Sequence, residues 1–255
     1  MSIVSGSPPS APASMGGLSS AVEDVSTGMS SLRFDGDSYL TRPQTGFANN
    51  KNSPWTFSVW IKKIQNGVNG GVFSTWARYN GHWQPQVIMF DGSDQLAYWL
   101  HDNGSGYKWN HRSTEKYRDI TGWYHLMVTH DNSNAYAYIY INGKMMTELS
   151  ISHNYATING VEEHVIGSYR GNPGEYYSRF NGYMADLVFV DGEALTPEST
   201  GELISDVWRH KKYSGGYGVN GFHLDFHPDN MVYDVNGQLI TVMDASGNDN
   251  HWQAH

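Results

Sequence analysis

The sequence has no cysteine, little charge and no long apolar run. Without cysteine the chain can form neither disulfides nor a Cys-ligated zinc site. Cysteine usage therefore does not indicate whether the protein works in an oxidising or a reducing compartment. No apolar run approaches the roughly 20 residues of a membrane-spanning helix. The first residues also lack the basic and apolar regions of a secretory signal. We therefore predict no contact with a membrane.

Charged residues make up only 16% of the 255 residues, against about 25% in an average soluble domain. The net charge of −9 argues against DNA or RNA as a partner, because phosphate binding needs clustered Lys and Arg. Aromatic residues reach 14%, and 28 glycines favour short strands with many turns. A surface rich in Tyr, Asn, Ser and Gly suits broad protein contacts or polyhydroxy ligands.

The clearest pattern is the alternation of residue types with period two, which is typical of strands. In Gly122–Lys144 two alternating runs flank the turn Asp131–Asn134, and Asn142-Gly143 closes the second run, which predicts an antiparallel hairpin. Trp55–Lys62 alternates as well. Shorter strands are expected at 31–34, 39–41, 71–76, 86–90, 95–100, 109–112, 148–151, 164–168, 182–190 and 221–226. This density of strands predicts two stacked antiparallel sheets.

Three segments remain beside the strands. We expect one short helix over Leu195–Val207, with Thr196 as N-cap and Pro197 at the first helical position. Residues 1–30 are rich in Ser, Gly, Ala and Pro, which predicts an extended flexible N-terminal arm. The sandwich is expected over residues 31–226, and residues 227–255 are expected to form a tail that packs on it. The arm is either a disordered tail or a segment that orders on a neighbouring subunit. Its apolar anchors would then be Ile3, Val4, Met15, Leu18 and Val22.

The hairpin Gly122–Lys144 resembles that of the concanavalin A-like, laminin-G/pentraxin-type jelly rolls, as do SLRFDGDSYL at Ser31–Leu40 and FNGYMADLVFVDGEALTP at Phe180–Pro197. The segment Val190–Ser199, VDGEALTPES, with GSYRGN at Gly167–Asn172 before it, is most similar to jelly-roll proteins of tailed bacteriophages. Asp244–Trp252 resembles a stretch that recurs in phage and lectin-like proteins. The resemblance implies an all-β, two-sheet antiparallel jelly-roll sandwich over about residues 30–226.

Glucanases of this fold carry two glutamates and an aspartate at alternate positions of one strand. The nearest candidates here are Asp186, Asp191 and Glu193. Asp186 and Asp191 are an odd number of residues apart, so a regular strand places them on opposite faces. The sequence also has neither a serine nucleophile elbow nor a phosphate loop. We predict that the protein is not an enzyme.

Lectins and pentraxins of this fold hold their sugar-binding loops with calcium, which prefers carboxylate and carbonyl oxygens. Two clusters offer such oxygens, Asp91 with Asp94 and Asp131 with Asn132. The alternative is that these residues simply build turns. No cofactor is required by the sequence, and calcium is the one that it allows.

A sugar site needs an aromatic platform beside amide or carboxylate groups. Trp83 in an expected loop, and Trp109 beside Tyr107 and Asn110, have that composition. The same aromatic residues could instead pack at the rim or contact another subunit, where Trp and Tyr are also enriched.

We predict a non-catalytic virion structural protein of a tailed phage. Three features favour it: the similarity to phage sequences, the low charge and the small-residue arm. It would be a capsid decoration (cement) or tail-associated module, made in the host cytoplasm and located on the virion. Its partners would be the major capsid or other virion proteins, and it would form a homo-oligomer. The alternative is a carbohydrate-binding, lectin-like receptor module on the virion surface that binds host polysaccharide through loop aromatics.

Overall fold

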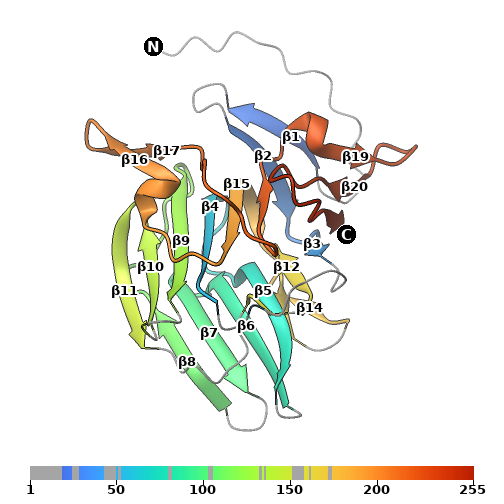
Figure 1. The fold of residues 1–255 in the computed structure, drawn as a ribbon. Helices are drawn as coiled ribbons and strands as arrows, with labels where there is room; N and C mark the ends of the chain where they lie inside the picture. Colours follow the sequence, from blue (N-terminus) through green and yellow to red (C-terminus); the bar gives the residue numbers. More distant parts are fainter. Residues whose placement is uncertain are drawn as a thin grey trace.

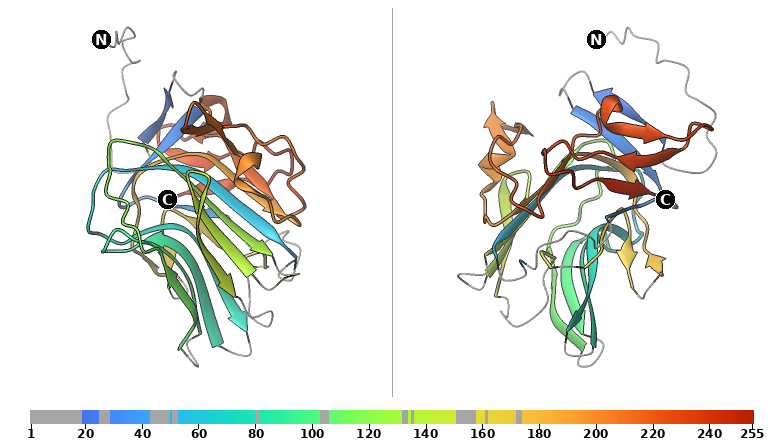
Figure 2. Two further views of the ribbon diagram at one scale, coloured as in Figure 1. Left: turned by 90° about the vertical axis from the view of Figure 1, so that its left-hand side faces the viewer. Right: turned by 45° about the vertical axis from the view of Figure 1, so that its right-hand side comes forward.

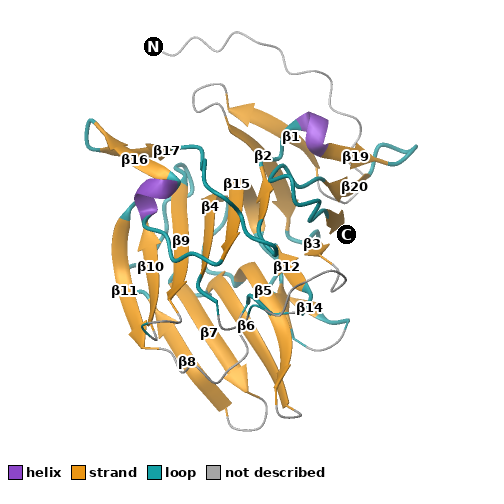
Figure 3. Cartoon of the chain, in the orientation of Figure 1, coloured by secondary structure: helices purple, strands orange, loops and turns teal. Residues whose placement is uncertain are grey.

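The computed structural model describes residues 19–24, 29–42, 50, 53–79, 82–102, 106–131, 134, 136–150, 158–160, 162–171 and 174–255. These residues form two large antiparallel sheets stacked as a sandwich, with two small hairpins and two 3-10 turns beside them (Figures 1 and 2). The two short helical segments, purple in Figure 3, are 3-10 turns, and none of the described residues forms an α-helix. No described helix has the length and apolar character needed to cross a membrane.

The first sheet has eight strands. Seven lie in the order β1 (Ser19–Asp24), β2 (Met29–Asp35), β15 (Asn181–Asp191), β4 (Trp55–Lys63), β9 (Tyr124–Asp131), β10 (Tyr136–Ile141) and β11 (Lys144–Ser150), and β18 (Phe222–Leu224) pairs with β15.

The second sheet has nine strands. Their order is β19 (Met231–Tyr233), β20 (Leu239–Val242), β21 (Trp252–Ala254), β3 (Leu40–Arg42), β12 (His164–Ile166), β5 (Gly70–Tyr79), β6 (His82–Phe90), β7 (Leu96–Asp102) and β8 (Gly106–Arg112). The small hairpins are β13 (Tyr169–Arg170) with β14 (Tyr176–Tyr177), and β16 (Gly201–Ile204) with β17 (Val207–His210). The 3-10 turns are Pro197–Ser199 and Pro228–Asn230.

The main core lies between the two sheets and confirms the predicted all-β sandwich. Phe57 of β4 stacks on Phe73 of β5 across the core, with ring centroids 4.6 Å apart. The alternation in β4 has the predicted result, because Trp55, Phe57, Val59 and Ile61 all face this core. Trp60 points to the opposite, outer face of the eight-stranded sheet, where it packs in a separate cluster.

The hairpin predicted over Gly122–Lys144 is confirmed. β9 and β10 pair in regular antiparallel register, from Tyr136 opposite Asp131 to Ile141 opposite Leu126. Asn142 and Gly143 both have positive φ, 50° and 75°, as the predicted tight turn requires.

The helix predicted over Leu195–Val207 is wrong. Thr196 and Pro197 do start a turn as predicted, but it is a single 3-10 turn that ends at Ser199. The chain then forms the β16–β17 hairpin, which Figure 1 shows in orange beside β9–β11. Ser205 and Asp206 close this hairpin with φ of 48° and 62°, a left-handed pair that no α-helix can contain.

Strand pairing begins before residue 31. Ser19–Asp24 forms β1, and Val22 lies there opposite Ser31 of β2. The other four predicted anchors, Ile3, Val4, Met15 and Leu18, lie outside the described residues.

The segment 227–255, predicted as a packed tail, supplies three strands of the nine-stranded sheet. Trp252 of β21 is fully buried in the main core. The loop before it is held by Asp244, whose carboxylate accepts bonds from the backbone N–H groups of His223 and Asn250 at 2.8 and 3.0 Å. The last residue, His255, exchanges two backbone hydrogen bonds with Tyr39.

Candidate functional site

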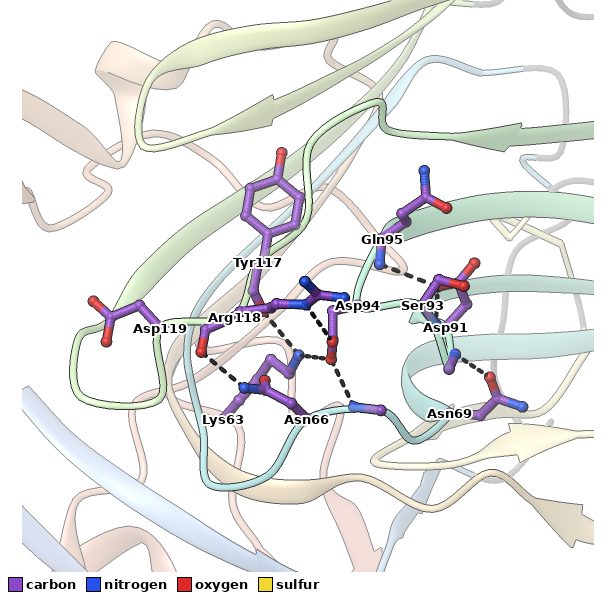
Figure 4. A network of polar contacts seen from close by, with 12 residues as sticks. Lys63, Asn66, Asn69, Asp91, Ser93, Asp94, Gln95, Tyr117, Arg118 and Asp119 are labelled. Carbon is purple, nitrogen blue, oxygen red and sulfur yellow. Dashed lines mark hydrogen bonds and ion pairs between the residues drawn. The ribbon is translucent and has the colours of Figure 1, made fainter.

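The first predicted calcium cluster forms a polar network that joins three loops (Figure 4). One carboxylate oxygen of Asp94 accepts bonds from the Lys63 ammonium at 2.9 Å and the Gly67 N–H at 2.8 Å, and the other accepts from Arg118 at 3.1 Å. Burial raises the pKa of Asp94, but these donors outweigh it and lower that pKa to about 2. Lys63 also donates to the Tyr117 carbonyl at 2.9 Å. Its ammonium therefore occupies the position that a cation bound to the Asp94 carboxylate and the Tyr117 carbonyl would take.

The other calcium candidates have the surroundings of turn residues. Asp91 accepts the backbone N–H groups of Ser93 and Gln95 and an ion pair from Arg112. Asp131 accepts both the backbone and the side-chain N–H of Asn134. Asn132 lies outside the described residues. Within the described part of the chain, no three His, Asp or Glu residues form a metal cluster, and the residues present do not fit a calcium ion.

The predicted sugar-site residues lie in strands of the nine-stranded sheet, so Trp83 is not in the expected loop. Trp83 belongs to β6, opposite Arg78 of β5. Tyr107, Trp109 and Asn110 belong to β8. Asn110 lies opposite Trp99 of β7, and its side-chain oxygen accepts a bond from Arg112 at 2.7 Å.

A different set of aromatic residues lines a cavity on the outer face of the eight-stranded sheet. The cavity, of about 300 Å³, lies against the β16–β17 hairpin and has a largely aromatic and apolar wall. A second cavity of about 140 Å³ adjoins it, sharing Met29 and His210. We call the two together the hairpin groove. Its residues are Met29, Trp60, Trp123, Val207, Trp208, Arg209 and His210, with Ser30, Asp186, Lys212, His223, Asp225 and His227 in the second cavity.

Trp208 fixes the hairpin above the sheet. Its ring stacks on His125 of β9, and its indole N–H donates to His125 Nδ1 at 2.9 Å. A side chain at Gly143 or Gly201 would collide with this ring, since a Cβ there would lie 2.5 or 2.4 Å from it. Two glycines and a buried histidine thus shape the slot for Trp208.

His125 looks like part of a catalytic dyad, because its Nε2 lies 2.9 Å from the hydroxyl of Ser58. The bond from Trp208 to Nδ1 places the proton on Nε2, so the ring donates to the Ser58 and Thr200 hydroxyls, 2.9 and 3.1 Å away. Burial lowers the pKa of His125 to about 3. A buried ring that already carries its proton toward serine cannot act as the general base for that serine.

The polar half of the groove centres on Asp186. Its two oxygens accept bonds from Nε2 of His210, at 2.6 Å, and of His223, at 2.7 Å. Burial raises the pKa of Asp186, but these two bonds prevail and leave the pKa well below its usual range. A bulge in β15 between Ala185 and Val188, with Asp186 at φ 44°, brings this carboxylate to the outer face.

Trp123 packs against the cluster of Met29, Trp60 and Ala185 at the groove. It is half-buried, yet its side chain makes neither a ring contact nor a hydrogen bond with any described residue. The Trp60 N–H is buried without an acceptor among the same residues. Both indoles line one cavity, where Trp123 offers a flat apolar surface.

Sequence reasoning missed this groove. The alternation in β4 did contain a signal, because four core residues on one face place Trp60 on the other. The partners come from distant segments, Trp123 before β9 and Trp208 just after the segment that was predicted to be helical. No sequence spacing links those three tryptophans.

The comparisons with solved structures agree with this fold. A putative carbohydrate-binding protein from Bacteroides ovatus has a TM-score of 0.58 at 16% identity, over 89% of this chain and 58% of that one. A heptameric SAP-like pentraxin from Limulus polyphemus has a TM-score of 0.48 at 20% identity, over 65% of this chain and 77% of that one. The CBM40 of the Ruminococcus gnavus IT-sialidase, bound to α2,3 sialyllactose, has a TM-score of 0.48 at 13% identity, over 72% and 96%.

No curated protein matches the chain significantly in sequence. A family model does match, over residues 34–199, and it is described as the concanavalin A-like lectin/glucanases superfamily. That match spans more than half of the chain, from β2 to the 3-10 turn before the β16–β17 hairpin. The protein therefore belongs to the concanavalin A-like lectin/glucanases superfamily.

Proposed function

We propose that the protein is a non-catalytic carbohydrate-binding module and that the hairpin groove is its binding site. The observation that carries the proposal is Trp123, a half-buried indole at the cavity that makes neither a ring contact nor a hydrogen bond with any described residue. Sugar rings stack their C–H faces on such indoles, while their hydroxyls need hydrogen-bonding groups nearby. His210, which lines both cavities, supplies such a group at the other end of the groove.

The fold supports this class of function without determining it. The superfamily contains both lectins and glucanases, and the Bacteroides ovatus protein is described as a putative carbohydrate-binding protein. The sequence alternative of a lectin-like module is therefore retained, with the site moved from the strands around Trp83 and Trp109 to the outer face of the other sheet.

Binding without catalysis is consistent with the state of the polar groups. Hydrolysis of a glycosidic bond needs an acid and a base or nucleophile in reach of one ligand. In the groove the buried Asp186 is bonded on both oxygens, and His125 is closed off by Trp208. A location on a phage particle stays a prediction from the sequence resemblance. A carbohydrate-binding receptor module would be compatible with that location.

The test is glycan binding by a Trp123→Ala variant. A glycan array with the full chain would first select a ligand, and titration calorimetry would then compare the variant with the wild type. Buried tryptophans at binding sites contribute about 2 kcal/mol or more, so we expect binding to weaken by about 30-fold.

Tyr233→Ala is the matched control, because Tyr233 is an exposed aromatic residue in β19 of the other sheet. Its affinity should equal that of the wild type. If Trp123→Ala binds normally while Trp109→Ala does not, the groove is the wrong site and the sequence candidates are the right ones.

A further inference from the structure

A run of basic residues borders the hairpin groove. Arg209-His210-Lys211-Lys212 places four basic side chains in succession, in a chain with 16 Lys and Arg against 25 Asp and Glu. Arg209 and His210 line the aromatic cavity, and His210 and Lys212 line the polar one. The strongest local positive run of an acidic protein therefore lies at its candidate binding site.

The two cations of this run that line the groove have no hydrogen-bond or ion-pair partner among the described residues. The side chains of Arg209 and Lys212 make neither an ion pair nor a hydrogen bond with any residue in the described part of the chain. Lys211, which does not line the groove, differs, since its ammonium donates to the Glu198 carbonyl at 2.8 Å. Arg209 and Lys212 are both exposed and thus accessible to a ligand in the groove.

The two acidic residues of the groove are already engaged. Asp186 is bonded by two histidines, as described above. Asp225 accepts the backbone N–H of His227 at 2.9 Å, and both of its oxygens accept the side-chain N–H of Asn230 at 3.0 Å. The carboxylates hold the groove together, and the charges left for a ligand are cationic.

We propose that the ligand of the hairpin groove is an acidic saccharide, an inference that rests on the proposed function and specifies its ligand class. A sugar ring lies against Trp123, and its carboxylate or sulfate pairs with Arg209 and Lys212. The planar guanidinium of Arg209 suits either anion, because two parallel N–H groups can bond two oxygens. The net charge of −9 disfavours non-specific binding of a polyanion to the molecule.

The experiment compares two polymers that differ only in charge, polygalacturonate and its fully methyl-esterified form. Dextran sulfate and dextran form a second pair, which distinguishes a sulfate ligand from a carboxylate. Titrations of the full chain are run in EDTA, so that calcium does not gel the acidic polymer. The variant is Arg209→Gln/Lys212→Gln, and Lys116→Gln/Lys144→Gln removes the same charge at exposed positions that do not line the groove.

We expect the wild type and the control variant to bind one acidic polymer at least about tenfold more tightly than its neutral counterpart, the gain expected for charge-assisted bonds. The groove variant should lose this preference and keep its affinity for the neutral polymer. Equal binding of charged and neutral forms by the wild type, or a preference kept by the groove variant, overturns the inference. A neutral glycan bound through Trp123 with no acidic polymer bound also overturns it and leaves the proposed function intact. Absence of any Trp123-dependent glycan binding removes both.

Discussion

Two histidines are buried in the sandwich as neutral rings. His164 of β12 donates from Nε2 to the Ile158 carbonyl at 2.6 Å and packs edge-on against Phe73. His125 is held between Trp60 and Trp208 on the outer side of the other sheet. Burial lowers the pKa of each to about 3, far below the ordinary value of 6.5. At the scale of single residues, both histidines therefore make the free energy of unfolding depend on pH.

The sign of this link is set by proton binding. Between pH 6.5 and 3 the unfolded chain binds protons at His125 and His164 that the folded chain does not, so the free energy of unfolding falls as the pH falls. Each histidine contributes a slope of about 1.4 kcal/mol per pH unit near pH 5. Urea titrations at pH 4.5, 5 and 5.5 should show a slope lower by that amount in His164→Leu than in the wild type. Equal slopes would mean that His164 is charged in the folded protein.

The character of single residues was only partly predictable. The tryptophans and histidines in the expected strands predicted a structure rich in aromatic contacts. The alternation in β4 also placed Trp60 on the face away from the core. Asp186 was different, because its face depends on a bulge and a positive φ that the sequence does not signal, and its two partners lie in β17 and β18. Its role is set by tertiary contacts that no local pattern contains.

At the scale of elements, Lys63 connects the end of β4 to two loops of the opposite sheet. Its ammonium lies between Asp94 and the Tyr117 carbonyl, and its side chain is 4% exposed. Removing one partner of a buried ion pair leaves the other charge unpaired. This clamp ties the three loops of Figure 4 together through the Lys63 ammonium.

We expect Lys63→Met to lower the free energy of unfolding by about 3–5 kcal/mol, because the Asp94 carboxylate stays buried with only Arg118 as counter-ion. Urea unfolding measures the loss, and Lys62→Met, at the neighbouring and more exposed position, is the control. Neither EDTA nor added calcium should shift the melting temperature of the wild type. A calcium-dependent melting temperature would contradict the assignment of these oxygens to Lys63.

The β16–β17 hairpin shows why one element was predicted wrongly. Thr196, Pro197 and Glu198 are a genuine helix-start signal, and the structure uses it for one turn. The path of the chain after that turn is decided by Trp208, which needs the slot at Gly143 and Gly201 and the acceptor on His125. Packing of one side chain outweighs a weak propensity for helix.

At the scale of the whole molecule, alternation and turn residues were sufficient to predict the two-sheet sandwich and its central hairpin. They were not sufficient for the ends, since β1 and β19–β21 lie in segments predicted as an arm and a tail. Short strands without strong alternation give little signal, and only their pairing with β2 and β3 makes them strands.

Trp252 anchors the C-terminal segment in the core. It is fully buried, 4.9 Å from Phe222 between ring centroids. We expect Trp252→Ala to lower the free energy of unfolding by about 3–5 kcal/mol, the range for removing a buried aromatic residue. Val235→Ala, at a fully exposed position, should change it by less than about 0.5 kcal/mol. A loss below about 1 kcal/mol for Trp252→Ala would mean that β21 frays from the sheet without affecting the core.

The position of β21 also sets the order of events during synthesis. It lies inside the nine-stranded sheet, between β20 and β3, so Gln253 can pair with Thr41 only after the whole sandwich between them has been made. Until then β3 has one open edge. Pairings between such distant segments are formed slowly, because a long loop must close before any contact is gained. The nine-stranded sheet should therefore be completed late, with the exposed edge of β3 as the most vulnerable point of the folding intermediate.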